Sequence, residues 1–409
     1  MTDVAEQHTS TPRKAGTAQA LPLLAASCMP VLGSVLITPV LPQISEHFAT
    51  TPGAPVLVPM IVAVPALMIA LFAPFAGQIA DRIARKKLLL GALIAYSIVG
   101  VAPALMDGLA GILASRVLLG VCEAAIMTVA TALIVDYFPD EKRRNRYLGL
   151  QAVTTTLAAT VFIAVGGALG ANGWHTPFWI YAAGLVIAVA VAALLWEPRT
   201  ERSDDSASSL PLSRIPWREI AMPLLVTLIG GITFYVLIVE ISYLVVGTGV
   251  EAQSTAIIGA VAAGASLATA VGGLTFPRVA RFTPARLLPT AFGLQATGML
   301  IIWLAPVSLV TVAGGAVIAS VGSGLLLPTL VVWVIARQPF EQRGRVSGLW
   351  NSAFYLGQFL APLLATGVAA ALGGLPAAIG VVGLAALVLT LLLVTSNRRA
   401  RTGADTPVA

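Results

Sequence analysis

Apolar residues in this chain form long runs that recur from residue 20 to residue 396, with short polar segments between them. Each run is about 18–28 residues long, which is enough for a helix to cross a hydrocarbon core of ~30 Å. The pattern therefore predicts twelve membrane-spanning helices. Their expected ranges are 18–43, 55–80, 88–106, 110–135, 147–171, 176–196, 219–246, 254–279, 287–304, 309–336, 347–372 and 375–396.

The composition supports a polytopic membrane protein. Hydrophobic residues make up 57% of the 409 residues and charged residues only 10%, whereas soluble domains contain about 25% charged residues. An ordinary soluble enzyme, a disordered chain and a collagen-like chain are therefore excluded. The 38 Gly and 26 Pro fit membrane helices, because Gly lets helices approach closely and neighbouring helices tolerate Pro. Cys28 and Cys122 lie in apolar runs, where thiols behave as small hydrophobes.

The positions of the basic residues predict the orientation of the chain. All but one of the 24 Lys and Arg residues fall in the two tails or in alternate loops, and the remaining loops contain none. The exception, Arg116, lies within an apolar run. The positive-inside rule then places both termini in the cytoplasm of a multi-pass protein of the inner or plasma membrane. The polar first 19 residues lack the layout of a cleaved signal peptide, so we expect the first apolar run to remain as a helix.

A Ser-rich loop divides the chain into two halves that resemble each other. Residues 77–86 align with residues 277–286, and residues 146–150 align with residues 345–349. Internal duplication is typical of secondary transporters, whose substrate site lies between the repeats near the bilayer midplane. The expected organisation is a cytoplasmic tail (1–17), a six-helix bundle (18–196), a cytoplasmic linker (197–218), a second six-helix bundle (219–396) and a cytoplasmic tail (397–409).

The predicted loop between helices two and three carries a recognisable motif. The segment 77–86 reads Gly-Gln-Ile-Ala-Asp-Arg-Ile-Ala-Arg-Lys and resembles the G-x-L-x-D-R-x-G-R-[KR] signature of the major facilitator superfamily. A basic loop that only anchors the topology would explain the Arg and Lys residues but not the Gly or the Asp. With twelve spans and a repeat, the resemblance extends over essentially the whole chain. It implies an all-α fold of two pseudo-symmetric six-helix bundles and a cytoplasmic gate that latches them, formed by Gly77, Asp81, Arg82, Arg85 and Lys86.

Two acidic residues lie deep in the predicted bilayer, Glu123 on helix four and Glu240 on helix seven. The resemblance implies that both helices face the central cavity, and ionisable groups within a membrane are functional candidates. Arg116 lies seven residues before Glu123, hence on the same face. We expect Glu123 to carry a proton or a cationic group of the substrate, and Arg116 and Glu240 to pair in one conformation and separate in the other. The alternative is a permanent structural pair between Arg116 and Glu123.

Further polar and aromatic residues are candidates for a binding pocket. Trp350, Asn351 and Tyr355 on helix eleven either line a pocket or join helices, and Tyr243, which flanks Glu240 on helix seven, is a further candidate for binding the proton or the substrate. Helix five retains the paired glycines, Gly166 and Gly167, of the motif found in drug antiporters of the superfamily, but lacks its Gly-Pro.

The resemblance favours proton-coupled efflux of a small drug or metabolite by alternating access. Uptake by proton symport or facilitated diffusion is the alternative, and a membrane enzyme or sensor is the rival from another class. The histidines lie outside the predicted spans and no P-loop occurs, so we expect no metal, no cofactor and no catalytic residue. The expected partners are a small-molecule substrate, protons and the lipid bilayer, without nucleic acid, and the protein is expected to work as a monomer.

Overall fold

The computed structural model describes residues 15–75, 84–198, 217–335, 338 and 340–404. Every regular element in these ranges is a helix, and twelve spans in them are long and apolar enough to cross a membrane, which confirms the predicted number. The elements are α1 (Thr17–Ser27), α2 (Met29–Val35), η1 (Thr38–Val40), α3 (Leu41–His47), α4 (Ala54–Phe72), α6 (Arg85–Val101), η2 (Ala102–Leu105), α7 (Leu109–Tyr137), α8 (Glu141–Gly170), η3 (Thr176–Ala182), α9 (Ala183–Leu194), α10 (Trp217–Gly247), α11 (Thr255–Val279), α12 (Pro284–Leu304), α13 (Leu309–Ile335), α14 (Phe340–Leu372) and α15 (Leu375–Ala404).

The first span is not the single continuous helix that the sequence predicts. It consists of α1, α2, η1 and α3, and it continues to His47 instead of ending at residue 43. Prolines cause the interruptions, because a proline has no N–H to donate to the carbonyl four residues earlier. Pro42 cannot donate to the Thr38 carbonyl, which accepts from the Leu41 N–H instead and also accepts a hydrogen bond of 2.7 Å from Ser242 of α10. The irregular backbone thus becomes a contact between the two halves of the chain.

Six spans precede residues 199–216, which belong to the predicted linker and lie outside the described residues, and six follow them. Glycines let helices pack closely within each half. A Cβ at Gly120 of α7 would lie 2.7 Å from the Cα of Pro65 in α4, and a Cβ at Gly231 of α10 would lie 3.1 Å from the Cα of Gly357 in α14. The many glycines of the sequence are therefore explained in part by close helix contacts.

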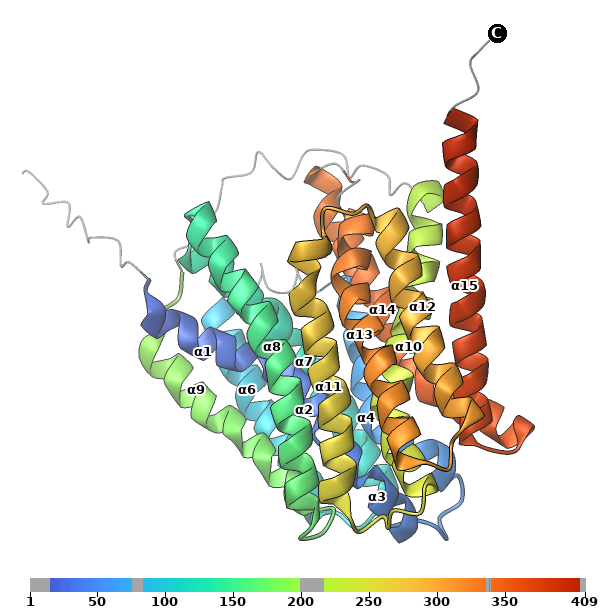
Figure 1. Cartoon of the computed structure of the whole chain (residues 1–409). Helices are drawn as coiled ribbons and strands as arrows, with labels where there is room; N and C mark the ends of the chain where they lie inside the picture. The colour runs from blue at the N-terminus through green and yellow to red at the C-terminus, as the bar shows by residue number, and fades with distance from the viewer. Residues whose placement is uncertain (1–14, 76–83, 199–216, 336–337, 339, 405–409) are drawn as a thin grey trace, which may run out of the picture.

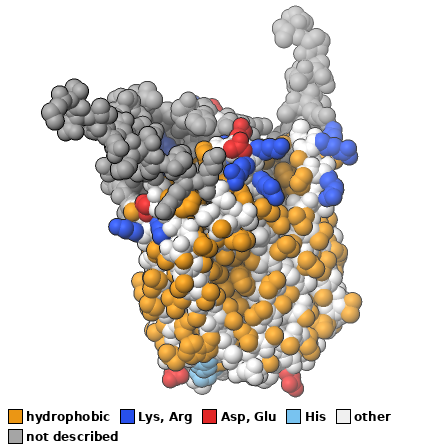
Figure 2. Space-filling view, turned by 90° about the vertical axis from the view of Figure 1, so that its left-hand side faces the viewer, with side chains coloured by type: hydrophobic (Ala, Val, Ile, Leu, Met, Phe, Trp, Pro, Cys, Tyr) orange, Lys and Arg blue, Asp and Glu red, His pale blue; other side chains and the backbone are white. Residues whose placement is uncertain are grey.

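The two ends of the molecule differ in charge. Figure 2 shows Lys and Arg side chains gathered at the upper end, a broad hydrophobic belt below them, and acidic and His side chains at the lower end. The upper end, which carries Arg85, Lys86, Arg143 and Arg281 of the described residues, is called the basic end below, and the lower end is called the opposite end. This distribution is the one that the loop charges predict.

The two halves pack most closely toward the opposite end. A Cβ at Gly167 of α8 would lie 2.8 Å from the Cα of Gly259 in α11, and Thr255 donates a hydrogen bond of 2.8 Å to the Gly167 carbonyl. Figure 1 shows α8 and α11 side by side there and diverging toward the basic end. On the other side of the molecule, α4 and α14 remain in contact, where Ser352 donates to the Ala70 carbonyl at 2.7 Å.

Candidate functional site

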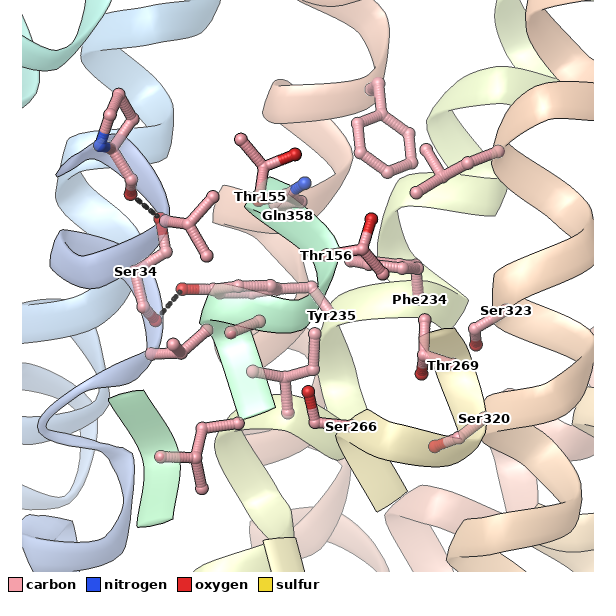
Figure 3. A pocket seen from close by; sticks show the side chains of 18 of the residues that line it. Ser34, Thr155, Thr156, Phe234, Tyr235, Ser266, Thr269, Ser320, Ser323 and Gln358 are labelled. Carbon is pink, nitrogen blue, oxygen red and sulfur yellow. Dashed lines mark hydrogen bonds between the residues drawn. The ribbon is translucent and has the colours of Figure 1, made fainter. Parts of the chain in front are cut away.

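A cavity of about 450 Å³ lies between the two halves. Helices α1, α2, α7 and α8 contribute its wall in the first half, and α10, α11, α13 and α14 contribute its wall in the second half (Figure 3). Its volume falls in the range of sites for drug-sized molecules. Its polar lining residues are Ser27, Ser34, Gln151, Thr155, Thr156, Tyr235, Ser266, Thr269, Ser320, Ser323, Asn351, Tyr355 and Gln358.

Three aromatic rings form an apolar patch on the wall of the second half. Trp350 and Phe354 are stacked with 5.6 Å between ring centroids, and Phe234 lies 5.5 Å from Phe354. The three positions come from two helices, because α14 presents residues 350 and 354 one turn apart and α10 presents residue 234 beside them. None of the described residues that line the cavity is an Asp, Glu, Lys, Arg or His. The cavity therefore combines an aromatic patch with uncharged polar groups.

Hydroxyl groups of α10 join the two halves beside the cavity and beyond it toward the opposite end. The Tyr235 hydroxyl lies 2.9 Å from the Val62 carbonyl and 3.1 Å from the Ser34 carbonyl, so its proton is shared between α4 and α2; Figure 3 draws the bond to Ser34. Further along α10, Tyr243 is hydrogen-bonded to Ser45 at 2.8 Å. Tyr243, which the sequence suggested for proton or substrate binding, thus joins the two halves and does not line the cavity. These bonds hold the two halves together on the side away from the basic end.

Glu123 is fully buried immediately behind the cavity wall. Its carboxylate touches Gly33 of α2, next to Ser34 on the wall, while Met127, one turn along α7, lines the cavity itself. Neither carboxylate oxygen has a hydrogen-bond partner among the described residues. A charged carboxylate in such a place costs several kcal/mol unless it is paired or hydrated.

Glu240 is the second buried acid, with 4% of its surface exposed. Its Oε1 has no hydrogen-bond partner among the described residues, and the next residue, Ile241, lines the cavity. The two acids therefore share one property, which is that each is buried and does not line the cavity itself.

Arg116 does not pair with Glu240 or with Glu123 in this structure. Its Nη2 donates to the Val99 and Gly100 carbonyls at 3.3 and 3.1 Å, and its guanidinium lies over the rings of Phe178 and Tyr181. Pro103 has no N–H for the Val99 carbonyl, so Arg116 satisfies the end of α6 and places a cation at a helix C-terminus. The expected contact with Glu240 is absent in this conformation because the guanidinium points into its own half.

Two residues of the predicted gate motif are described, and each of them contacts other helices of the first half. Arg85 forms an ion pair with Asp136 near the end of α7. Lys86 donates through Nζ to the Ala192 carbonyl at 2.9 Å, near the C-terminus of α9, where a cation is favourable. Gly77, Asp81 and Arg82 lie outside the described residues, so the latch between the halves stays a prediction.

The cavity contains residues that sequence reasoning proposed and residues that it missed. Trp350, Asn351 and Tyr355 line the wall, and the structure therefore favours the first of their two expected roles. Gln358 was not assigned, although it follows Trp350 by eight residues and so lies on the same face of α14. Tyr235 was also not assigned. An isolated Tyr in an apolar helix was the available signal, but its carbonyl partners on α2 and α4 could not be read from sequence.

Comparison with known proteins agrees with the fold. The family model described as Major Facilitator Superfamily matches residues 23–275 and 224–408. A bacterial homolog of the human lysosomal transporter Spinster, in an inward-facing and unoccupied conformation, superposes with a TM-score of 0.71 at 22% identity, covering 93% of this chain and 94% of that chain. The nucleoside transporter NupG gives a TM-score of 0.71 at 11% identity, covering 92% and 98%.

Similarity to curated sequences is partial. The class B tetracycline resistance protein of Escherichia coli is 28% identical over 186 residues, which is 46% of each chain. The quinolone resistance protein NorA of Staphylococcus aureus is 24% identical over 201 residues, which is 48% of this chain and 51% of that protein. The chain thus spans about half the length of the curated relatives it matches. Since the family model covers nearly all of the sequence, the chain belongs to the Major Facilitator Superfamily, and its family and fold are those of a multi-pass membrane transporter.

Proposed function

We propose that this protein exports a small organic compound from the cell by alternating access, driven by protons. The observation that carries the proposal is a cavity between two six-helix halves, which are joined by hydrogen bonds toward the opposite end. Relatives named for resistance to tetracycline and to quinolones favour export over uptake. Uptake by symport or facilitated diffusion is the alternative function.

We infer the orientation of the protein in the membrane from its charge distribution, and this orientation indicates on which side of the membrane the cavity lies. With the basic end on the cytoplasmic side of a cell membrane, both termini are cytoplasmic and the cavity lies on the inward side. The hydroxyl-to-carbonyl bonds of Tyr235, Ser242 and Tyr243 then form the closed external side. A compound in the cytoplasm or in the inner leaflet would enter the cavity in this state, and rocking of the halves would release it outside.

Glu123 is the residue we assign to proton coupling. It is buried without a hydrogen-bond partner among the described residues, and its carboxylate lies against Gly33, next to Ser34 on the cavity wall. When the first and seventh spans separate at the external side, water would reach this carboxylate and exchange its proton. A carboxylate that is dry in one conformation and wet in the other takes up and releases a proton during the cycle.

The test is a flux measurement on the purified protein, which we expect to work as a monomer in the bilayer. Proteoliposomes are loaded with a panel of labelled drugs and metabolites. A proton gradient is then imposed that drives protons toward the cytoplasmic face of the protein. Export requires that at least one compound moves against its gradient and opposite to the protons. Movement of compound and protons in the same direction would establish symport instead. Flux of no compound, together with lowered or unchanged drug tolerance in expressing cells, would contradict the export proposal.

A further inference from the structure

The polar groups on the cavity wall are mostly hydrogen-bond acceptors. Four hydroxyls donate their protons to carbonyls of their own helices: Ser34 to Pro30 at 2.9 Å, Thr155 to Gln151 at 2.9 Å, Thr156 to Ala152 at 2.7 Å and Thr269 to Ala265 at 3.3 Å. A hydroxyl whose proton is used in this way presents only lone pairs to a neighbour. Figure 3 shows Thr155, Thr156 and Thr269 arranged around the cavity.

Two other hydroxyls are used in the same manner. Ser27 donates to the Leu23 carbonyl at 2.8 Å and accepts from Gln151, and Ser323 donates to the Ala319 carbonyl at 3.2 Å and accepts from Gln295. Because the amide nitrogen of Gln151 is occupied by Ser27 and Thr131, its remaining amide group is the acceptor oxygen. The first-half wall therefore offers acceptors with few competing donors.

One amide on the wall of the second half forms no hydrogen bond of this kind. Gln358 of α14 is 5% exposed and lines the cavity, yet it forms no hydrogen bond with any described residue. Asn351, seven residues earlier and so about 10.5 Å away along the same face, is likewise without a hydrogen bond to the described residues. Neither amide has a fully buried polar atom that lacks a partner, so water in the cavity can hydrate both. A bound molecule that both donates to and accepts from these amides would replace that water.

We propose that the cavity binds an uncharged amphipathic compound that has several N–H or O–H donors on one side and a flat apolar ring on the other. This inference rests on the proposed transport function and specifies its substrate class. The ring would lie on Phe234, Phe354 and Trp350, and the donors would face the hydroxyl oxygens of α8 and α11. An ionised group would lose its hydration in a cavity whose described lining contains no opposite charge.

The probes for this proposal are phenyl β-glucoside, which is neutral and rich in donors, and three analogues of it. Phenyl glucuronide adds an anionic group, phenyl glucosaminide adds a cationic group, and the tetra-O-methyl ether of the glucoside keeps the acceptors but removes the donors. Binding to the purified protein is measured by calorimetry at neutral pH. We expect the glucoside to bind at least about tenfold more tightly than either ionised analogue. We also expect it to bind at least about fivefold more tightly than the methyl ether.

Matched variants test whether the preference arises in the cavity. Thr156→Val should weaken glucoside binding about fivefold and leave methyl ether binding unchanged, because the lost acceptor matters only to a donor. Thr297→Val is the control, since Thr297 is exposed on α12 and donates to its own helix at the Gly293 carbonyl without lining the cavity.

The proposal is overturned if the glucoside does not bind, if an ionised or methylated analogue binds as tightly, or if Thr297→Val has the same effect as Thr156→Val. Because binding needs neither a gradient nor flux, its failure leaves the transport experiment unaffected. Conversely, a neutral preference in a protein that transports nothing would refute the proposed function alone.

Discussion

Glu123 of α7 holds its carboxylate against Gly33 of α2, so closely that a methyl group at position 33 would overlap Oε1. The contact joins the fourth span to the broken first span, one residue from the cavity wall. Only glycine leaves room for the acid there while Leu119 packs on the other side. The position of the acid and the identity of the glycine are therefore one structural feature.

Gly33→Ala should destabilise the protein through this contact. The added Cβ must displace the carboxylate or α2, and overpacking of this kind costs about 1–3 kcal/mol. The measurement is the thermal unfolding midpoint of purified protein in detergent. Glu123→Ala in the same chain removes the overlap, so the double variant should be less destabilised than the sum of the two single changes.

The matched control is Gly91→Ala, because Gly91 is also helical but a Cβ there would meet nothing within 4 Å. It should leave stability unchanged or raise it by about 0.5–1 kcal/mol, as expected for Ala in place of Gly in a helix. Additive effects of Gly33→Ala and Glu123→Ala would show that the two residues do not share the contact.

Arg116 is expected to act on stability and not on coupling. Arg116→Lys should lower the unfolding midpoint, because a single ammonium cannot reach both the Val99 and Gly100 carbonyls while lying over Phe178 and Tyr181. Losing charged hydrogen bonds of this kind costs about 1.5–3 kcal/mol each. The protein that does fold should keep proton-driven transport per molecule, measured in proteoliposomes with matched protein content.

The charge exchange Arg116→Glu with Glu240→Arg separates this interpretation from the one based on sequence. If Arg116 and Glu240 paired during the cycle, the exchange would restore activity that each single change removes. We expect no restoration, since a Glu at position 116 would face two carbonyl oxygens. Recovery of transport in the exchanged variant would reinstate the charge pair.

Sequence patterns predicted the fold much better than the contacts of individual side chains. Twelve apolar runs and the loop charges determine the number of spans, because bilayer thickness and the positive-inside rule act on averages over many residues. The direction in which Arg116 points depends on one proline, Pro103, which frees a carbonyl on a different helix. That partner lies on another helix, so the sequence gives no local signal for it.

The same limit explains why the breaks in the first span and the different positions of the two tyrosines in the seventh span were not predicted. Pro30, Pro39 and Pro42 could have predicted breaks in the first apolar run, but hydropathy alone treats the run as continuous. Tyr243 and Tyr235 look equivalent in sequence as tyrosines of an apolar helix. In the structure Tyr235 lines the cavity and Tyr243 does not, although both hydroxyls bind carbonyls of the first half. These contacts depend on the irregular backbone opposite the two tyrosines.

Acidic conditions should destabilise the protein through His175. Burial, together with the neighbouring His47, lowers the pKa of His175 from its ordinary 6.5, while Asp107 opposes the shift. The unfolded chain therefore takes up a proton before the folded one does, so this contribution to stability is constant above pH 6.5 and falls as the pH drops below it. Unfolding midpoints at pH 7.5 and pH 5.5 should differ less for His175→Gln than for the wild type. An identical difference in both proteins would contradict the prediction.

Tyr235→Phe should favour the conformation that is open at the opposite end. The change removes one hydroxyl that binds α2 and α4 from α10, and one hydrogen bond of about 0.5–1.5 kcal/mol changes a population ratio about two- to tenfold. Spin labels at Asn172→Cys and Glu251→Cys, in a chain with Cys28 and Cys122 replaced by Ala, report the distance between the halves there.

We expect a larger population at long distances in Tyr235→Phe. Tyr147→Phe is the control, because Tyr147 stacks on Phe138 and its hydroxyl forms no hydrogen bond with the described residues. If both variants shift the distances equally, the Tyr235 hydroxyl has no special part in closing the external side.

Glu123→Gln should separate proton coupling from substrate movement. The amide nearly preserves the size of the side chain beside Gly33, but it cannot gain and lose a proton in the physiological range. Proton-driven accumulation of substrate in proteoliposomes should therefore fall at least about tenfold, while exchange of labelled for unlabelled substrate without a gradient should persist. Glu240→Gln, measured in parallel, tests whether the second buried acid takes part.

The unfolding midpoint of Glu123→Gln determines how the loss is interpreted. A buried carboxylate with no hydrogen-bond partner among the described residues contributes little to stability, so its replacement by an amide should leave the midpoint unchanged or raise it. A structural acid would behave in the opposite way, with a lower midpoint and with exchange lost together with accumulation. Full proton-driven accumulation in both Glu123→Gln and Glu240→Gln would show that neither carboxylate carries the coupling proton. If Glu123→Gln alone keeps exchange and loses accumulation, the coupling proton is bound at Glu123, behind the cavity wall. Glu123 contacts the first span, and the external part of that span must move during the transport cycle.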